Sequence, residues 1–167
     1  MRLERRQMDK KKKMERYEKS LHELSHLIGT EGKYAVDGIG RMALISAVLR
    51  ANLPYFLFVG FYRVVGNDML IIGPYQGEMV VCGTIPFGKG VCGVCAVRKE
   101  TIIVDDVSKF PGYIACDSET KSEIVIPVFE SGELTAVFDV DGTCLADFDN
   151  TDRHYLEEIV TIYFKNK

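Results

Sequence analysis

Cysteine and acidic residues gather in the middle of this 167-residue chain in a pattern typical of thiol redox chemistry. Cys116 lies in the run Gly-Tyr-Ile-Ala-Cys-Asp, and six positions later comes the pair Ser122-Glu123. Upstream, Cys82 and Cys92 lie ten residues apart around a glycine-rich turn. A cysteine is nucleophilic as its thiolate, and a second thiol can condense with its oxidised form into a disulfide. These residues therefore predict redox chemistry at sulfur.

A second pattern matches the zinc-protease signature H-E-x-x-H at residues 22–26. His22 and His26 would share one helix face, with Glu23 as the base of a hydrolase. The longer form of the signature requires a further histidine where this chain has Gly32. A glutamate could replace that ligand, but a chain this short leaves little room for a peptidase cleft. We therefore interpret the two histidines as exposed residues of an amphipathic helix and expect no metal site.

Two glycine- and cysteine-containing motifs lack a required part. Residues 83–89 resemble a P-loop, but Gly90 stands where the magnesium-binding Ser or Thr belongs. Cys92 and Cys95 form a C-x-x-C pair, yet no βαβ pattern surrounds them as in a thioredoxin-like site. We expect a tight turn that enters a helix here, and the start of that helix would favour the thiolate of Cys92.

The run Asp-Val-Asp-Gly-Thr at 139–143 resembles the nucleophile motif of haloacid-dehalogenase-type phosphatases. Only 24 residues follow it, too few to build the doubly wound fold of that family. Asp139 and Asp141 alternate along an expected strand, so both carboxylates should point to one face. Because the preceding residues are apolar, two buried acids there would need a functional reason. A strand end that reaches water is the alternative.

Composition indicates a single domain with a substantial core. Apolar residues make up 47% of the chain and charged residues 27%, with a net charge of −3. No apolar run approaches the roughly 18 residues that span a bilayer. The charged N-terminus has no apolar signal segment. We therefore expect a cytoplasmic protein with no membrane partner, whose five cysteines are reactive, metal-bound or buried rather than joined in structural disulfides.

The charge is divided unevenly along the chain. Residues 1–16 carry eight basic and three acidic residues, a net +5, which leaves −8 for the remainder. No aromatic residues are interleaved with these charges, so we interpret the segment as a solvated helix end and expect no nucleic-acid partner. We expect a basic helical extension over 1–30 that packs onto a single domain over 31–167. An amphipathic helix over 14–28 could seat a homodimer.

The spacing of apolar residues predicts the elements. Helical spacing extends from 14 to 28, where Gly29 and Gly32 end it, and again over about 33–52. Short β-rich segments follow, separated by turn residues; they predict strands at 56–65, 69–72, 78–85, 101–104, 123–129 and 134–140. A short helix is expected over 91–98, and a last helix to about 165 is capped by Asp149 or Thr151. Hairpin-linked strands imply an antiparallel sheet with the terminal helices on one face.

Cys116 lies in a long polar loop, expected over 105–121, of the kind that is usually functional or disordered. The segments that flank it form an ordered set: 73–77, Cys82, 90–93, 105–107, 114–117, 122–125 and 139–141. In these motifs the chain resembles the free methionine-(R)-sulfoxide reductases, which are GAF-domain enzymes, over about residues 33–165. The resemblance implies an α+β GAF fold with about six antiparallel strands and helices on both sides. It also implies reduction of free L-methionine (R)-S-oxide to methionine by thioredoxin, without a cofactor.

The resemblance assigns roles to three cysteines. Cys116 matches the nucleophile and becomes a sulfenic acid, which a second thiol condenses into a disulfide. Cys82 matches the resolving position. Cys92 matches the third cysteine, which could resolve the sulfenic acid instead or relay the disulfide. Cys95 and Cys144 have no counterpart in the family, and we expect both to be small buried residues.

The resemblance also defines a substrate pocket. Its acids are Glu123, Asp139 and Asp141, of which two would bind the ammonium group of a free amino acid and one would donate a proton to the sulfoxide oxygen. Glu123 is therefore expected to be catalytic as well as substrate-binding. Phe58 and Tyr62 are expected to line the pocket.

Two residues of the expected site depart from the family pattern. Phe58 stands where the family commonly has tryptophan, and Tyr113 stands where histidine is usual. Phe still packs well against a methyl thioether.

Two other functions compete with the reductase. A non-catalytic GAF domain that binds a small ligand would share the fold, because a fold does not define a function. The three cysteines favour the reductase, since ligand binding alone does not need thiols placed for exchange. A zinc peptidase built on residues 22–26 is the other alternative.

Overall fold

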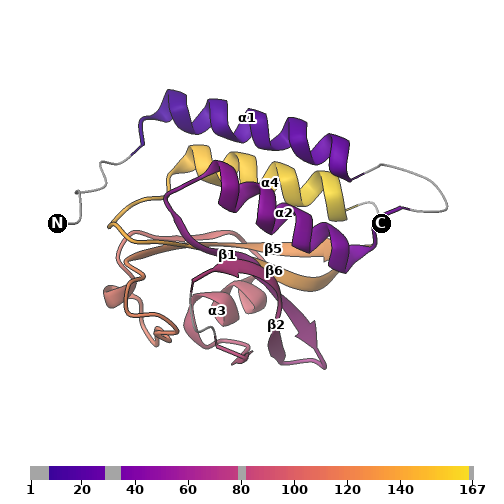
Figure 1. The fold of residues 1–167 in the computed structure, drawn as a ribbon. Coiled ribbons are helices and arrows are strands. Elements are labelled where there is room, and N and C mark those ends of the chain that lie inside the picture. The colour runs from indigo at the N-terminus through magenta and orange to yellow at the C-terminus, as the bar shows by residue number, and fades with distance from the viewer. Residues whose placement is uncertain (1–7, 29–34, 79–81, 166–167) are drawn as a thin grey trace.

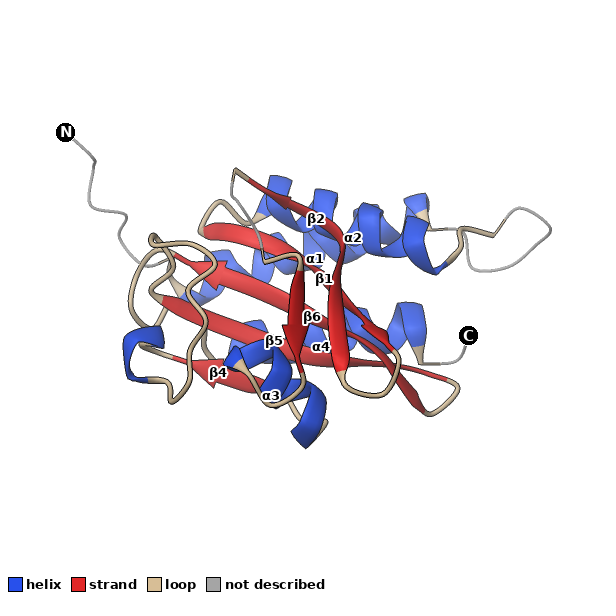
Figure 2. Cartoon of the chain, turned by 90° about the horizontal axis from the view of Figure 1, so that it is seen from below, coloured by secondary structure: helices blue, strands red, loops and turns tan. Residues whose placement is uncertain are grey.

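The computed structural model describes residues 8–28, 35–78 and 82–165, which form four α-helices and one six-stranded sheet (Figures 1 and 2). The helices are α1 Lys10–Leu27, α2 Gly38–Asn52, α3 Gly90–Arg98 and α4 Asn150–Phe164. The strands are β1 Phe56–Val65, β2 Met69–Gly77, β3 Thr84–Pro86, β4 Ile102–Val104, β5 Ser122–Glu130 and β6 Glu133–Gly142. A short 3-10 helix spans Val107–Lys109.

The sheet is antiparallel throughout, with strand order β3-β2-β1-β6-β5-β4. Figure 1 shows α2 and α4 on one face of the sheet, α1 outside them, and α3 on the opposite face. The α+β architecture, with six antiparallel strands and helices on both sides of the sheet, is therefore as expected. None of the helices in the described ranges is long and apolar enough to cross a bilayer.

Two hydrophobic layers follow from the alternation of side chains along the strands. Toward α2 and α4, the buried residues of the central strands are Val59, Phe61, Ile124, Phe138 and Val140. Toward α3, they include Phe58, Tyr62, Val125 and Val137. The face toward α3 also carries the acids of β5 and β6, so the site and the main core lie on opposite sides of the sheet.

Helix α1 is attached to the rest of the protein by a buried ion pair. Lys13 is only 4% exposed, and its Nζ donates to Asp152 on α4 and to the backbone oxygen of Asp147. Tyr17 and Tyr55 also donate to the Asp152 carboxylate. The interpretation of the basic N-terminal segment as solvated is therefore wrong for Lys13. Its partner Asp152 lies 139 residues away in sequence, so no pattern among neighbouring residues indicates this ion pair.

Four element boundaries differ by four residues or more from those expected from the sequence. Helix α1 begins at Lys10, where Asp9 caps it, rather than at 14. Helix α2 begins at Gly38 rather than near 33, because the Asp37 side chain accepts from the Gly40 amide and caps the helix there. Strand β2 continues to Gly77, beyond the expected end at 72. Strand β3 starts only at Thr84, and residues 79–81 of the expected strand lie outside the described part, as do Gly29 and Gly32.

The remaining elements follow the predicted pattern. α3 and α4 agree with the expected helices, and Asp149 caps α4 through the Thr151 amide. The β5–β6 hairpin turns at Ser131 and Gly132, both with positive φ, as the Ser-Gly pair indicated.

Candidate active site

The start of α3 is held tightly against the turn that precedes it. A Cβ at Gly93 would lie 2.3 Å from the backbone oxygen of Pro86, so only glycine allows this approach. Gly90 adopts φ +59° and its N–H donates to the Gly112 oxygen at 3.2 Å. This bond joins the start of α3 to the loop that contains Cys116. Cys92 and that loop therefore border the same cleft.

Cys82 and Cys116 form a disulfide across 34 residues of sequence, with a Cα–Cα distance of 5.4 Å. Cys82 precedes β3, and Cys116 lies in the loop between the 3-10 helix and β5. This distance is within the limit of about 7 Å between Cα atoms that a disulfide requires. Both side chains are partly exposed, so the bond is accessible to another thiol.

Three carboxylates share the sheet face that looks toward α3. Glu123 on β5 lies opposite Asp141 on β6, and Asp141 also lies opposite Phe58 on β1. Asp139, two residues earlier on the same strand, points to the same face, as the alternation predicted. All three acids are at most 9% exposed.

The cleft between this face, α3 and the Cys116 loop has about 430 Å³ of space, part of it open to solvent. Its aromatic and aliphatic lining consists of Phe58, Tyr62, Tyr113, Ile85, Val91 and Ile114. The polar lining consists of Cys92, Cys116, Asp117, Thr120 and the three acids. No Lys, Arg or His belongs to the described lining, so the carboxylates have no basic partner within the cleft.

Burial raises the pKa of each of these acids above its ordinary value. For Glu123, burial acts first and the Asp139 and Asp141 carboxylates add to it, so the pKa of Glu123 is well above its usual range. Burial raises the pKa of Asp139 to about 7. Asp141 is shifted in the same direction by burial and by the charge of Asp139. The cleft therefore holds acids that can carry a proton near neutral pH.

Cys92 is buried beside two of these acids, and its Sγ donates to Glu123 Oε1 at 3.9 Å. Burial and the charges of Asp139 and Glu123 raise the pKa of the Cys92 thiol. The expectation that the start of α3 would favour a Cys92 thiolate is therefore wrong, because desolvation and like charge outweigh the helix dipole. Cys95, one turn later, is also buried and donates to the backbone oxygens of Glu100 and Val125.

The structure brings most of the predicted site residues together. Cys116, Cys92, Glu123, Asp139, Asp141, Phe58 and Tyr62 line one cleft, and Cys82 joins it through the disulfide. The lining residues Asp117, Thr120 and Ile114 were not predicted as site residues. Asp117 and Ile114 are neighbours of Cys116 in sequence, whereas no local signal indicated that Thr120 would be buried there.

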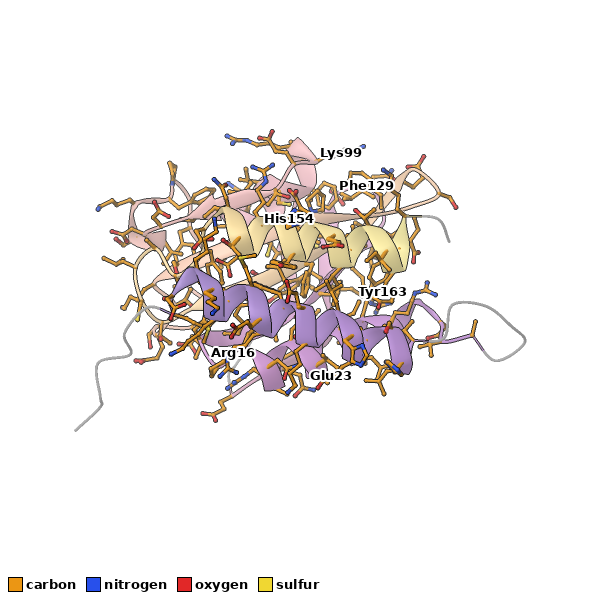
Figure 3. The ribbon with its side chains drawn as sticks, turned by 90° about the horizontal axis from the view of Figure 1, so that it is seen from above. Arg16, Glu23, Lys99, Phe129, His154 and Tyr163 are labelled. Carbon is orange, nitrogen blue, oxygen red and sulfur yellow. A yellow bond between two sulfur atoms is a disulfide. The ribbon has the colours of Figure 1, made fainter. Side chains whose placement is uncertain are left out.

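The zinc-protease signature lies on the outer helix α1, on the other side of the sheet from the cleft (Figure 1). His22 and His26 are exposed, as expected. Glu23, labelled with Arg16 in Figure 3, accepts a hydrogen bond from the Asn52 side chain at 2.7 Å, and Arg16 donates to the Asn52 backbone oxygen. These residues therefore attach α1 to the end of α2.

One group in the described ranges has three side chains placed to hold a metal ion. It consists of Cys92, Glu123 and Asp139, whose ligand atoms lie within 4.8 Å of one another. His22 and His26 are not part of such a group.

The fold and the cleft define the class of protein. The sequence profile of the GAF domain matches residues 43–163, which include the six strands and the whole cleft, so this is a GAF-domain protein. The chain is 38% identical to GAF domain-containing protein A of Dictyostelium discoideum, over 93% of this chain and 95% of that protein.

Within that class, the chain is similar to named methionine sulfoxide reductases. The chain is 46% identical to the free methionine-R-sulfoxide reductase of Saccharomyces cerevisiae, over 65% of this chain and 62% of that protein. The crystal structure of the Neisseria meningitidis enzyme in complex with its substrate superposes with a TM-score of 0.82 at 36% identity, over 97% of this chain and 93% of that one. The chain belongs to the free methionine-R-sulfoxide reductase family.

Proposed function

We propose that this chain reduces free methionine (R)-sulfoxide to methionine with its own thiols and is recycled by a thioredoxin-type dithiol. The observation that carries the proposal is the meeting of a Cys82–Cys116 disulfide and three buried carboxylates at one cleft, whose lining among the described residues contains no basic side chain. A free amino acid carries an ammonium group that a residue within a peptide lacks. Carboxylates without a cationic partner suit that group.

The first step takes place at Cys116 in the reduced protein. Its thiolate attacks the sulfoxide sulfur, and the oxygen passes from the substrate to the cysteine, so methionine leaves and Cys116 becomes a sulfenic acid. An acid that protonates the sulfoxide oxygen makes this transfer easier. Glu123, with its raised pKa, is our candidate donor, while Asp139 and Asp141 hold the ammonium.

The second step forms the disulfide. The Cys82 thiol attacks the sulfenic sulfur of Cys116, and water leaves. The 5.4 Å Cα–Cα distance supports Cys82 rather than the buried Cys92 as the resolving residue. An external dithiol then exchanges with the partly exposed disulfide and is itself oxidised. Overall, two thiols and one sulfoxide give one disulfide, one thioether and one water.

The aromatic residues of the cleft lining would contact the methyl thioether end of the substrate. Phe58 packs face to face with Tyr75 at a centroid distance of 5.5 Å, which holds its ring at the cleft wall. Tyr62 lies nearby on the same strand. Apolar rings of this kind bind thioether sulfur well.

A coupled assay tests the proposed reaction. Purified reduced protein is given the R and S epimers of methionine sulfoxide, both free and within a peptide, with thioredoxin, its reductase and NADPH. Consumption of NADPH with the free R epimer alone is the expected result. Equal rates with peptide-bound sulfoxide would contradict the assignment of the carboxylates to an ammonium group.

A GAF domain that only binds a ligand is the second candidate. Thiol titration separates the two, because the reductase loses two thiols per chain after one turnover without reductant, whereas a binding domain loses none. We expect a cytoplasmic protein, since the proposed cycle depends on a reducing thiol pool. A homodimer is also expected; the outer face of α1 exposes Met14 and Leu27, and light scattering of the purified chain would test it.

A further inference from the structure

Asp139 and its neighbours form a second kind of binding site within the cleft. The Asp139 side chain is 6% exposed, and its Oδ1 is buried without a hydrogen-bond partner among the described residues. An unpaired carboxylate oxygen in the interior is costly, so a cation in this position would be favoured. The nearest groups that could share a cation with it are Cys92 and Glu123.

We propose that Cys92, Glu123 and Asp139 bind one zinc ion, and that zinc occupying this site excludes the substrate. The three ligand atoms lie within 4.8 Å of one another, and Cys92 Sγ is 3.9 Å from Glu123 Oε1. In a tetrahedral site with usual Zn–S and Zn–O bonds, sulfur and oxygen ligands are about 3.6 Å apart. The observed separation is therefore close to that of a zinc site, and small side-chain shifts complete it.

The ligand types favour zinc over the common hard cations. One thiolate with two carboxylates suits a borderline ion, whereas Ca²⁺ and Mg²⁺ prefer oxygen ligands alone. Three protein ligands leave a fourth position, which the solvent-connected cleft can supply with water. Cys92 binds as the thiolate, and its proton passes to solvent when the ion binds.

The ion would share Asp139 with the proposed substrate ammonium and would occupy the proposed proton donor Glu123, so its inhibitory effect rests on the proposed function. Asp139 cannot serve both cations at once. Zinc should therefore raise the apparent KM for methionine sulfoxide without lowering kcat. Binding of the ion itself does not depend on the reaction and can be measured without substrate.

The test uses the full chain in its disulfide-bonded form, so that Cys82 and Cys116 cannot act as ligands. Co²⁺ is added first, because a thiolate ligand gives a charge-transfer absorption that carboxylates and histidines do not. We expect one equivalent of Co²⁺ to produce this absorption, and one equivalent of Zn²⁺ to abolish it.

Variants then identify the ligands. Cys92→Ser should remove the charge-transfer absorption. Asp139→Asn should retain it but weaken zinc affinity by at least roughly tenfold, measured by competition with a chromophoric chelator. Cys95→Ser, which removes a buried thiol outside the group, should change neither.

Several results would overturn the proposal. These are the lack of a charge-transfer band in the wild-type protein, a band that persists in Cys92→Ser, or zinc affinity that falls only in a His22→Ala/His26→Ala variant. If Cys92→Ser does not fold, the wild-type spectrum still shows whether a thiolate binds the metal. The isosteric Asp139→Asn variant then shows whether the ion lies at this site. A chain that binds zinc but does not reduce methionine sulfoxide would contradict the proposed function and leave the zinc site standing.

Discussion

Glu123 on β5 lies directly opposite Asp141 on β6, so two carboxylates face each other across an antiparallel pair inside the protein. Like charges in this position destabilise a sheet. Burial adds to the effect, and the pKa values of both groups are raised. The Glu123–Asp141 pair therefore lowers the free energy of unfolding, and a bound cation or a bound proton relieves this effect. Such a loss of stability is expected at a functional site.

Replacement of Cys116 should stop the proposed reaction. We expect Cys116→Ser to have no turnover in the thioredoxin-coupled assay, because a serine hydroxyl cannot take up the oxygen as the Cys116 thiolate does when it becomes a sulfenic acid. Cys144→Ser is the matched control, since its thiol is outside the lining of the cleft, and it should retain the wild-type rate. Full activity of Cys116→Ser would refute the nucleophile assignment.

Cys82→Ser should separate the two steps. The first turnover still releases one methionine per chain, but the sulfenic acid on Cys116 cannot condense with Cys82 and accumulates. A sulfenic-acid trapping reagent followed by mass spectrometry should detect it on Cys116. If instead a Cys92–Cys116 disulfide forms at the wild-type rate, Cys92 is the resolving residue.

Glu123→Gln should lower kcat by more than about tenfold, because an amide cannot donate the proton that the acid supplies. Thr101→Val is a control at a partly buried position away from the cleft, where the hydroxyl donates only to Glu157. Rates of both variants are compared at saturating sulfoxide. An unchanged kcat for Glu123→Gln would assign the proton donor to another group.

The stability of the protein should fall as pH rises through the acid range. Below about pH 4, Asp139 is protonated in both states; between about 4 and 7, only the folded protein retains the proton. The free energy of unfolding therefore decreases with pH in this window and levels off above it. Asp139→Asn should flatten the slope and stabilise the chain at pH 8 by on the order of 2 kcal/mol.

Melting curves recorded from pH 4 to 8 in the presence of a metal chelator test the predicted decrease in stability. Asp106→Asn is the control, because hydrogen bonds from Ser108 lower the pKa of this partly exposed carboxylate, so it should not produce the same slope. An Asp139→Asn variant with the wild-type slope would show that the other two acids account for the dependence.

The buried pair between Lys13 and Asp152 should hold α1 in place. Lys13→Ala leaves the Asp152 carboxylate without its cation and should destabilise the protein by about 3–5 kcal/mol, measured by urea unfolding. Lys11→Ala, at an exposed position on the same helix, should have little effect. Equal losses in the two variants would contradict our proposal that residues 1–30 form an extension packed onto a domain over 31–167.

Most of the fold could be predicted from the sequence because its elements have strong local signals. The apolar, β-rich runs of β1 and β6 and the Ser-Gly turn at 131–132 depend on neighbours in the chain. The start of α2 was misplaced because the Asp37 cap decides it, and the sequence pattern there is weak. The extent of β3 was misplaced because its pairing with β2 decides it. Lys13 was misjudged because its partner is distant in sequence.

In the candidate site too, features set by neighbouring residues were predicted, and features set by distant residues were not. The alternation of Asp139 and Asp141 predicted a shared face, and the motifs around Cys116 predicted the family. The thiolate character expected for Cys92 was misjudged, because helix position is local, whereas burial of the thiol and the charges of Asp139 and Glu123 are not. The burial of Thr120 had no local signal.

By itself the sequence determined which residues could do chemistry and which strands would carry them, because side-chain type and alternation are properties of consecutive residues. Only the tertiary structure decided which of these groups meet: the pairing of Cys82 with Cys116, the Glu123–Asp141 register, and the unpaired oxygen of Asp139. Distance and burial depend on contacts between segments far apart in the chain, and pKa values and metal binding follow from them.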